Sequence, residues 1–259
     1  MKMQSNFKIR ASASCQITTN PTGKSNLEKY NDAIDKLLSL ELQYETFKNK
    51  ECKSAIEILS EKIPVTKKLI SELETIKDKV ELSQTTITYV HNYIKEQIYG
   101  VRKSIKSKYL DKGLKLEDTA IDKAIEWLDL SFAIKNEQYF EDEFFCGTPD
   151  LIVDGVVYDT KCSWDCFTFP LFEDEIPNKD YFYQLQVYMH LTGLKKACLV
   201  YVLLNTPDDL PQWEDKHNYD NMDKKYRIKK YDIEYSEEVI QDLQNRVINV
   251  REYIKTIEL

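Results

Sequence analysis

Two aspartates and a lysine flank a short turn, and their types and spacing suit phosphate chemistry. Asp154-Gly155 lies between two apolar runs, at 151–153 and 156–158, and is a dipeptide typical of two-residue hairpin loops. This turn fixes the register of the hairpin and makes Asp150 the cross-strand partner of Asp159. Because side chains alternate along a strand, Asp150, Asp159 and Lys161 share one face. The hairpin therefore places two acids and a cation together.

Two aspartates on directly opposite strands repel each other, because their Cβ atoms are only about 5 Å apart. A hard divalent cation between them removes the repulsion, and oxygen ligands suit Mg²⁺, which also binds substrate phosphate oxygens. Lys161 on the same face would hold an attacking water or neutralise charge on the phosphate. The hairpin predicts a metal-dependent phosphodiesterase; the alternative is an exposed turn with an ordinary Asp–Lys pair.

Several helices and strands are expected around this hairpin. Residues 113–128 have the apolar spacing of a helix packed on a sheet, and Glu117 is on the packed side. Glu117 is either a capping acid in the first turn or a further metal ligand. Residues 139–145 are expected to form one strand, which makes a three-stranded meander with the hairpin. A helix at 181–193, strands at 198–204 and 226–233, and a helix from Ser236 complete a mixed sheet.

The region from about 26 to 110 has mostly helical periodicity and is expected to form a helical arm. Pro64 is expected to separate two helices. Ser83 is a suitable N-cap for a further helix that ends near Gly100.

The motifs Gly147-x-x-Asp150, Asp159-x-Lys161 and Gln184-x-x-x-Tyr188 occur in this order on the expected elements. This arrangement resembles the RecB-like and lambda-exonuclease-like, or phage-type, branch of the PD-(D/E)xK nucleases. The resemblance extends over about residues 113–204, and the upstream Glu117 is similar to the acidic first-helix motif of phage-type members. One departure is the second acid, which is more often Glu in the family.

The resemblance implies an α/β fold: a restriction-endonuclease-like α-β-β-β-α-β core with a mixed central sheet flanked by helices and an N-terminal helical arm. Residues 1–110 would form a DNA-end segment and the arm, packed on the core, and residues 111–259 the nuclease core. It also implies hydrolysis of DNA with two Mg²⁺ or Mn²⁺ ions. The metal ligands would be Asp150, Asp159, the Thr160 carbonyl and, for the second ion, Glu117.

The resemblance also assigns roles to side chains that are not metal ligands. Lys161 would position the attacking water, and Gln184 and Tyr188 would face the active site and the DNA backbone. The alternative for Tyr188 is an aromatic residue packed in the core. The iron–sulfur members of the RecB-like group have a cluster of cysteines near the C-terminus. No cysteine follows Cys198 in this chain, so the resemblance does not imply an iron–sulfur cluster.

Two basic segments are candidates for DNA contact. Arg10, Ser12 and Ser14 are similar to the N-terminal Arg/Ser element with which phage exonucleases hold a DNA end; a helix N-cap is the alternative for the serines. A second stretch precedes the Glu117 helix and is either a DNA contact or a solvated face. Its residues are Arg102, Lys103, Lys106, Lys108, Lys112 and Lys115.

The composition limits the remaining classes. The net charge of −8 argues against non-specific binding of nucleic acid over the whole protein surface. No run of apolar residues is long enough for a membrane span and no signal peptide is present, so a cytoplasmic protein without a membrane partner is expected. Six scattered cysteines indicate neither a zinc site nor disulfides.

The sequence therefore predicts a metal-dependent DNA exonuclease of phage-type recombination, repair or replication. It would act on linear DNA ends, and the helical arm would clamp DNA, mediate an oligomer or bind a single-strand annealing partner. The alternatives are a non-catalytic DNA- or partner-binding module of the same fold, or a restriction-type endonuclease.

Overall fold

The computed structural model of the chain describes residues 6–104, 107–207 and 217–257. These residues form two compact units. One unit combines the N-terminal segment up to Thr19 with Thr88–Leu259, and the other is Asn20–Ile87. No helix within the described ranges is both long and apolar enough to cross a membrane.

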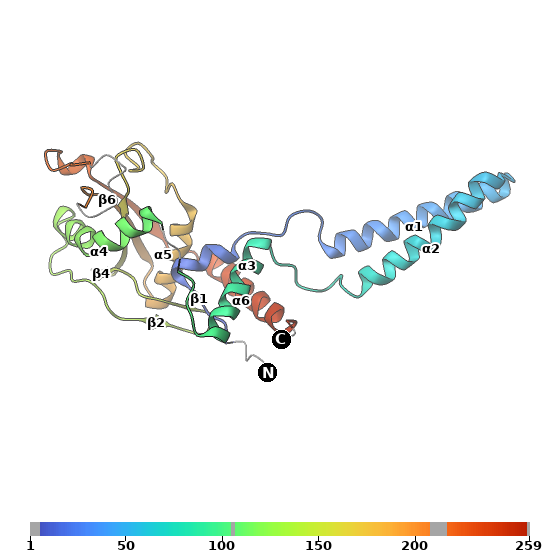
Figure 1. Cartoon of the computed structure of the whole chain (residues 1–259), viewed down its shortest axis with the longest axis horizontal. Coiled ribbons are helices and arrows are strands. Elements are labelled where there is room, and N and C mark those ends of the chain that lie inside the picture. Colours follow the sequence, from blue (N-terminus) through green and yellow to red (C-terminus); the bar gives the residue numbers. More distant parts are fainter. Residues whose placement is uncertain (1–5, 105–106, 208–216, 258–259) are drawn as a thin grey trace. The chain divides into compact units, whose positions relative to one another are not determined.

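The unit Asn20–Ile87 consists mainly of two paired helices, α1 (Asn26–Asn49) and α2 (Lys53–Glu74) (Figure 1). The α1 helix starts with a capping box between Ser25 and Glu28. The prediction that Pro64 separates two helices is wrong, because α2 continues through it. The break lies at residues 50–52, where Glu51 has a φ of 55°. A proline removes one helical hydrogen bond, but α2 remains packed on α1.

The central sheet of the other unit has the order β4-β5-β6-β7. Its strands are β4 (Leu151–Val153), β5 (Val156–Ser163), β6 (Lys196–Leu203) and β7 (Ile228–Glu234). The β4–β5 and β6–β7 pairs are antiparallel and the β5–β6 pair is parallel, so the sheet is mixed, as predicted. The expected α/β fold with a mixed central sheet is confirmed.

A second, small sheet corrects one expectation. The expected strand at 139–145 is two strands, β2 (Phe140–Glu141) and β3 (Phe145–Gly147), which pair antiparallel. The side chain of Asp142 forms the turn between them by accepting hydrogen bonds from the backbone N–H groups of Phe144 and Phe145. The other edge of β3 pairs with β1 (Ile9–Arg10), so the expected meander with the hairpin does not form.

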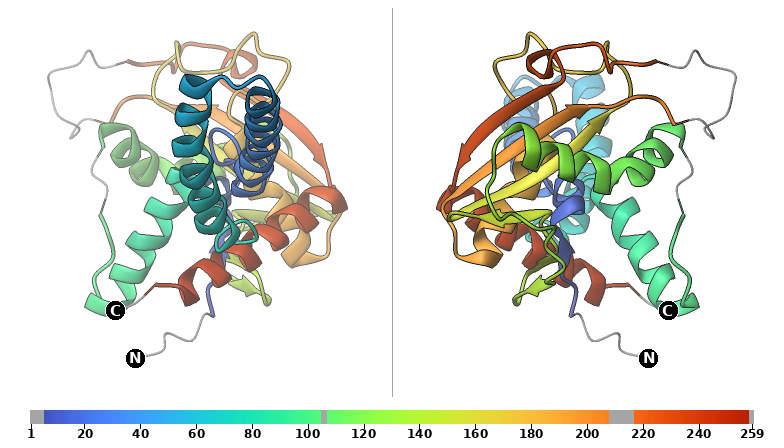
Figure 2. Two further views of the ribbon diagram at one scale, coloured as in Figure 1. Left: turned by 90° about the vertical axis from the view of Figure 1, so that its right-hand side faces the viewer. Right: turned by 90° about the vertical axis from the view of Figure 1, so that its left-hand side faces the viewer.

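Helices cover both faces of the central sheet. Helix α4 (Lys108–Trp127) lies across β5 and β6 (Figure 2) and packs Ala120 and Ala124 against Cys198, Val200 and Val202. It starts five residues before the expected Gly113, and Leu114 of this helix is exposed. Helix α5 (Lys179–Thr192) contacts β5, β6 and α6 (Glu237–Lys255).

The remaining elements frame this core. The 3-10 helix η1 (Ala11–Ile17) packs on α5, and η2 (Lys224–Tyr226) precedes β7. Helix α3 (Gln84–Tyr99) begins and ends as predicted: Ser83 accepts a hydrogen bond from the backbone N–H of Thr86, and Gly100 has a φ of 65°.

Candidate active site

The β4–β5 hairpin has the register expected from the sequence, with Leu151 opposite Tyr158 and Val153 opposite Val156. Asp154 and Gly155 form the loop with φ angles of 49° and 77°, as a primed turn requires. Asp150 lies just before β4. Its Oδ2 accepts a hydrogen bond of 2.7 Å from the backbone N–H of Thr160, which fixes the carboxylate beside β5.

Asp159 is the most enclosed acid of this region, with 1% of its surface exposed. Its Oδ2 lies 2.7 Å from the Nζ of Lys161, and its Oδ1 accepts a hydrogen bond of 3.0 Å from Gln184. The Nζ of Lys161 also donates to the Oε1 of Gln184 at 3.4 Å and lies 4.7 Å from the ring centre of Tyr181. The acid, the lysine and the amide therefore form one network between β5 and α5.

The electrostatics of the two aspartates follow from this burial. Burial and the charge of Asp159 raise the pKa of Asp150 to about 7, although the hydrogen bond from Thr160 opposes the shift. Burial lowers the pKa of Lys161, but the charge of Asp159 and its hydrogen bond outweigh this effect, and the pKa is raised. Lys161 therefore stays cationic at neutral pH, while Asp150 is held against its like-charged neighbour.

Glu117 lies in the interior of α4, so the interpretation as a first-turn capping acid is wrong. Its Oε1 lies 2.7 Å from the Nζ of Lys135, which lies at the same distance from Asp118. The charge of Glu117 nevertheless raises the pKa of Asp150 and of Tyr188, which places it near the aspartates. Glu117 is thus close to the site but paired with a lysine.

Gln184 and Tyr188 lie one turn apart on α5, and both are buried. The Nε2 of Gln184 donates a hydrogen bond of 3.2 Å to the hydroxyl of Tyr188, so Tyr188 fixes the position of the glutamine amide. Gly147 permits this packing: a Cβ there would lie 2.8 Å from the Tyr188 ring and 3.1 Å from the Cβ of Ala11. The glycine of the sequence motif is therefore a close-approach position.

The N-terminal segment lies beside this cluster, because β1 pairs with β3 and η1 packs on α5. Arg10 and Ser12 are exposed there. Ser14 is fully buried, and its hydroxyl donates to the carbonyl of Ala11 at 2.8 Å. Neither serine is the N-cap of η1, since Arg10 has that position.

The second basic stretch is only partly surface. Arg102 and Lys103 are exposed, whereas Lys106 and the side chain of Lys108 lie outside the described residues. Lys112 is 1% exposed, and its Nζ donates to the carbonyl oxygens of Trp164 and Leu204. Its role as part of a DNA-contacting stretch is therefore wrong: it fastens α4 to the ends of β5 and β6.

Three contributors were missed by sequence reasoning. Tyr181 is three residues before Gln184, so the helical period of α5 was a usable signal. Lys135 and Asn136 lie in the connection after α4, which has no periodic pattern. Asn136 fastens this connection to the site, because its backbone N–H donates to the carbonyl of Asp150 at 2.7 Å.

The acids of this site are candidate ligands for a divalent cation. Asp150 and Asp159 provide oxygen ligands, and their repulsion is the expected signature of a cation site. Among the residues that the structure describes, no group of three or more His, Cys, Asp or Glu is placed to hold a metal. Glu117 would have to leave Lys135 to become a third protein ligand.

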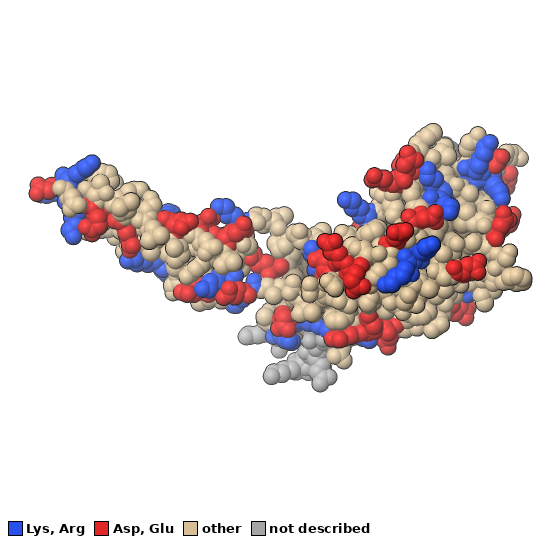
Figure 3. Space-filling model, turned by 180° about the vertical axis from the view of Figure 1, so that it is seen from behind, with Lys and Arg blue, Asp and Glu red and all other residues tan. Residues whose placement is uncertain are grey.

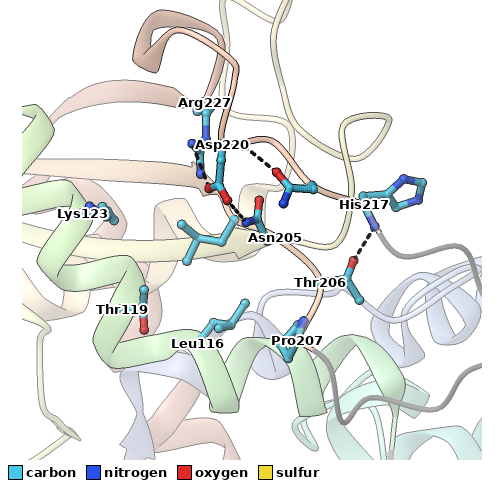
Figure 4. Close-up of a pocket in the computed structure, with 11 residues that line it drawn as sticks. Leu116, Thr119, Lys123, Asn205, Thr206, Pro207, His217, Asp220 and Arg227 are labelled. Atoms are coloured by element: carbon cyan, nitrogen blue, oxygen red, sulfur yellow. Dashed lines mark hydrogen bonds and ion pairs between the residues drawn. The ribbon is translucent and has the colours of Figure 1, made fainter.

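A separate hollow of about 500 Å³ opens beside α4, and its lining does not include these acids (Figure 4). Its own acid, Asp220, accepts a hydrogen bond of 2.9 Å from Asn205 and lies 3.9 Å from the guanidinium of Arg227. Asp220 thus pairs with other residues of this hollow, and the aspartates of the β4–β5 hairpin lie outside it.

Comparison with known proteins gives structural matches only: no family model and no curated protein matches the chain. A phage-related exonuclease from Haemophilus somnus 129PT has a TM-score of 0.68 at 24% identity, over 96% of this chain and 94% of that one. An alkaline exonuclease (LHK-Exo) from Laribacter hongkongensis has a TM-score of 0.56 at 14% identity, over 95% and 87%. LHK-Exo in complex with dAMP has a TM-score of 0.51 at 19% identity, over 66% and 80%. The chain therefore has the fold of the phage-type exonucleases, the branch of the PD-(D/E)xK superfamily that its motifs resemble.

Proposed function

We propose that the protein is a metal-dependent deoxyribonuclease that degrades DNA from its ends. The observation that carries the proposal is the pair Asp150 and Asp159, two like-charged acids held together beside Lys161. A structural role gives no reason for this repulsion, whereas a cation between the acids turns it into binding energy. The exonuclease fold of the structural neighbours supports the same conclusion.

The chain's own residues would divide the work as follows. Asp150, Asp159 and the Thr160 carbonyl would hold Mg²⁺ or Mn²⁺, and Glu117 would serve a second ion once released from Lys135. The bound ion would supply Lewis-acid activation of the phosphate and lower the pKa of a bound water. Lys161, held cationic by Asp159, would orient the water and neutralise charge on the phosphate.

The remaining residues would position these groups and the DNA. Gln184 orients both Asp159 and Lys161 through its amide, and Tyr188 fixes Gln184. Arg10 and Ser12 are exposed beside this cluster and would contact the DNA end, while Arg102 and Lys103 would contact its backbone. Ser14, being buried, would support the turn that presents them.

The paired helices α1 and α2 would serve assembly. These two helices expose apolar side chains, which suits contact with another protein. The exposed fractions are 60% for Leu38, 72% for Leu42 and 70% for Val65. We therefore include in the proposal that these helices bind a second copy of the chain or a single-strand annealing protein. The process served would be phage-type recombination, repair or replication. Sedimentation equilibrium of the wild type and of a Leu38→Lys/Leu42→Lys variant would test for the oligomer.

The decisive experiment is digestion of end-labelled linear DNA with 5′-phosphate, 5′-hydroxyl and blocked ends, in Mg²⁺ and in EDTA. We expect shortening from free ends in Mg²⁺ only, and no cleavage of a circular duplex. Asp150→Asn and Asp159→Asn should abolish digestion, whereas Asp122→Asn, an exposed acid on α4, should not. Cutting of the circle would indicate the restriction-type alternative. DNA binding without any digestion would indicate the non-catalytic module.

A further inference from the structure

The connection between α4 and β2 carries two large apolar side chains in solvent. Phe132 is fully exposed, at 102%, and Ile134 is 80% exposed. Phe132 also has a φ of 61°, in the left-handed region that bulky residues rarely adopt. A strained backbone that holds an aromatic ring away from the core has no stabilising role within the chain. Such positions are typical of functional sites.

This connection is fastened at the candidate active site. The backbone N–H of Asn136 donates to the carbonyl of Asp150 at 2.7 Å, and its side-chain amide donates to the carbonyl of Pro149 at 2.9 Å. Lys135 holds Glu117 and Asp118. A span of four residues reaches at most about 14 Å, so Phe132 lies within about 14 Å of Asn136, which corresponds to about four nucleotides of a DNA strand at about 3.4 Å each.

The charges around the connection do not provide the usual attraction for DNA. The acids Glu117, Asp118 and Asp150 surround its anchors, and the net charge of the chain is −8. On the face shown in Figure 3, acidic and basic side chains are interspersed rather than gathered into one basic surface. Base stacking on an aromatic ring does not depend on such a surface, and every base offers a face for it.

We propose that Phe132 stacks on an unpaired base of the DNA strand whose phosphate is bound at Asp150 and Asp159, and that Ile134 packs beside it. The occupant is thus a frayed or single-stranded DNA end. This inference rests on the proposed nuclease function and adds a base contact to it, made by an element that none of the site motifs includes.

The test uses linear DNA with the fluorescent base 2-aminopurine at each of the first four positions from the end, in Ca²⁺ in place of Mg²⁺, so that a cation still holds the phosphate at the two aspartates. Stacking on Phe132 should change the fluorescence at one position, and Phe132→Ala should remove that change. Phe132→Trp should restore it, whereas Phe132→Leu, apolar but without an aromatic ring, should not. The matched control is Phe172→Ala, because Phe172 is 87% exposed on a different loop.

A second readout separates base contact from chemistry. In Mg²⁺, Phe132→Ala should raise KM for DNA roughly 5- to 150-fold. Hydrolysis of bis(p-nitrophenyl) phosphate, which has no base, should keep its rate.

The outcomes distinguish the two proposals. If the wild type digests DNA and Phe132→Ala matches it in fluorescence and KM, stacking is refuted while the nuclease stands. If Phe172→Ala loses the fluorescence change and raises KM as much as Phe132→Ala does, stacking on Phe132 is refuted as well. A changed sedimentation coefficient of Phe132→Ala without DNA would show instead that Phe132 lies between copies of the chain. A wild type that neither binds nor cuts DNA would overturn both proposals.

Discussion

Replacing Asp150 by asparagine should stabilise the metal-free protein at alkaline pH. The structure holds the Asp150 carboxylate, partly buried, beside Asp159, and its pKa rises from 3.8 to about 7. A shift of this size corresponds to roughly 4 kcal/mol of folding free energy above pH 7. Local relaxation and water entry reduce the effect, so we expect about 2–4 kcal/mol. The asparagine side chain would keep an oxygen acceptor for the Thr160 N–H and lose only the charge.

The sign of the pH dependence follows from the raised pKa. Between the unfolded pKa near 4 and the folded pKa near 7, the folded state binds more protons, so wild-type stability falls as the pH rises through this window. The advantage of Asp150→Asn should therefore be near zero at about pH 4 and complete above about pH 8. Thermal unfolding of both proteins in EDTA, from pH 4 to 9, measures it as a Tm difference on the order of 10 °C at the alkaline end.

Controls make this test specific to the acid pair. Asp122→Asn should change stability by less than about 0.5 kcal/mol at every pH. Mg²⁺ at about 100 times its dissociation constant should stabilise the wild type by about 2.7 kcal/mol but leave Asp150→Asn unchanged. An Asp150→Asn protein that is no more stable than the wild type at pH 9, or whose advantage does not vary with pH, would refute the repulsion between Asp150 and Asp159.

Three further predictions concern the surroundings of the pair. Lys161→Met should lower the rate of DNA digestion about 10²- to 10³-fold, and Lys196→Met, an exposed lysine at the start of β6, should not. Because the pKa of Lys161 is raised above 10.5, the midpoint of any activity loss caused by its deprotonation should lie above pH 10.5. Gly147→Ala should destabilise the fold by about 1–3 kcal/mol in urea unfolding through contact with Tyr188, whereas Gly113→Ala, which has open space in α4, should be neutral or stabilising. Lys135→Met should cost less than about 1 kcal/mol of stability but tighten Mn²⁺ binding in calorimetry by freeing Glu117, and Lys123→Met, which breaks the comparable pair with Glu126, should leave Mn²⁺ binding unchanged.

The hairpin was predictable because its information is local. Asp154-Gly155 permits the positive φ angles of a primed turn, and the turn fixes the register of residues 151–153 against 156–158. Side-chain alternation then places Asp159 and Lys161 on one face. The cap Ser83 was readable for the same reason, since it acts on a backbone group within three residues.

Contacts between distant segments were not readable. The strand expected at 139–145 divides because Asp142 caps a turn and because β1, more than 130 residues away in the sequence, pairs with β3. The β-propensity of this aromatic segment is equally compatible with one strand or two. The pairing with β1 decides between them.

The sequence by itself determined the acids, the lysine and the helix that faces them, because turn chemistry and periodicity act over a few residues. Only the tertiary structure decided which charges remain paired. It holds Glu117 on Lys135, buries Lys112 between strand ends and leaves Phe132 in solvent, four residues before the Asn136 that hydrogen-bonds to Asp150. These outcomes depend on which chain segments pack together, and packing partners far apart in the sequence leave no periodic trace in it.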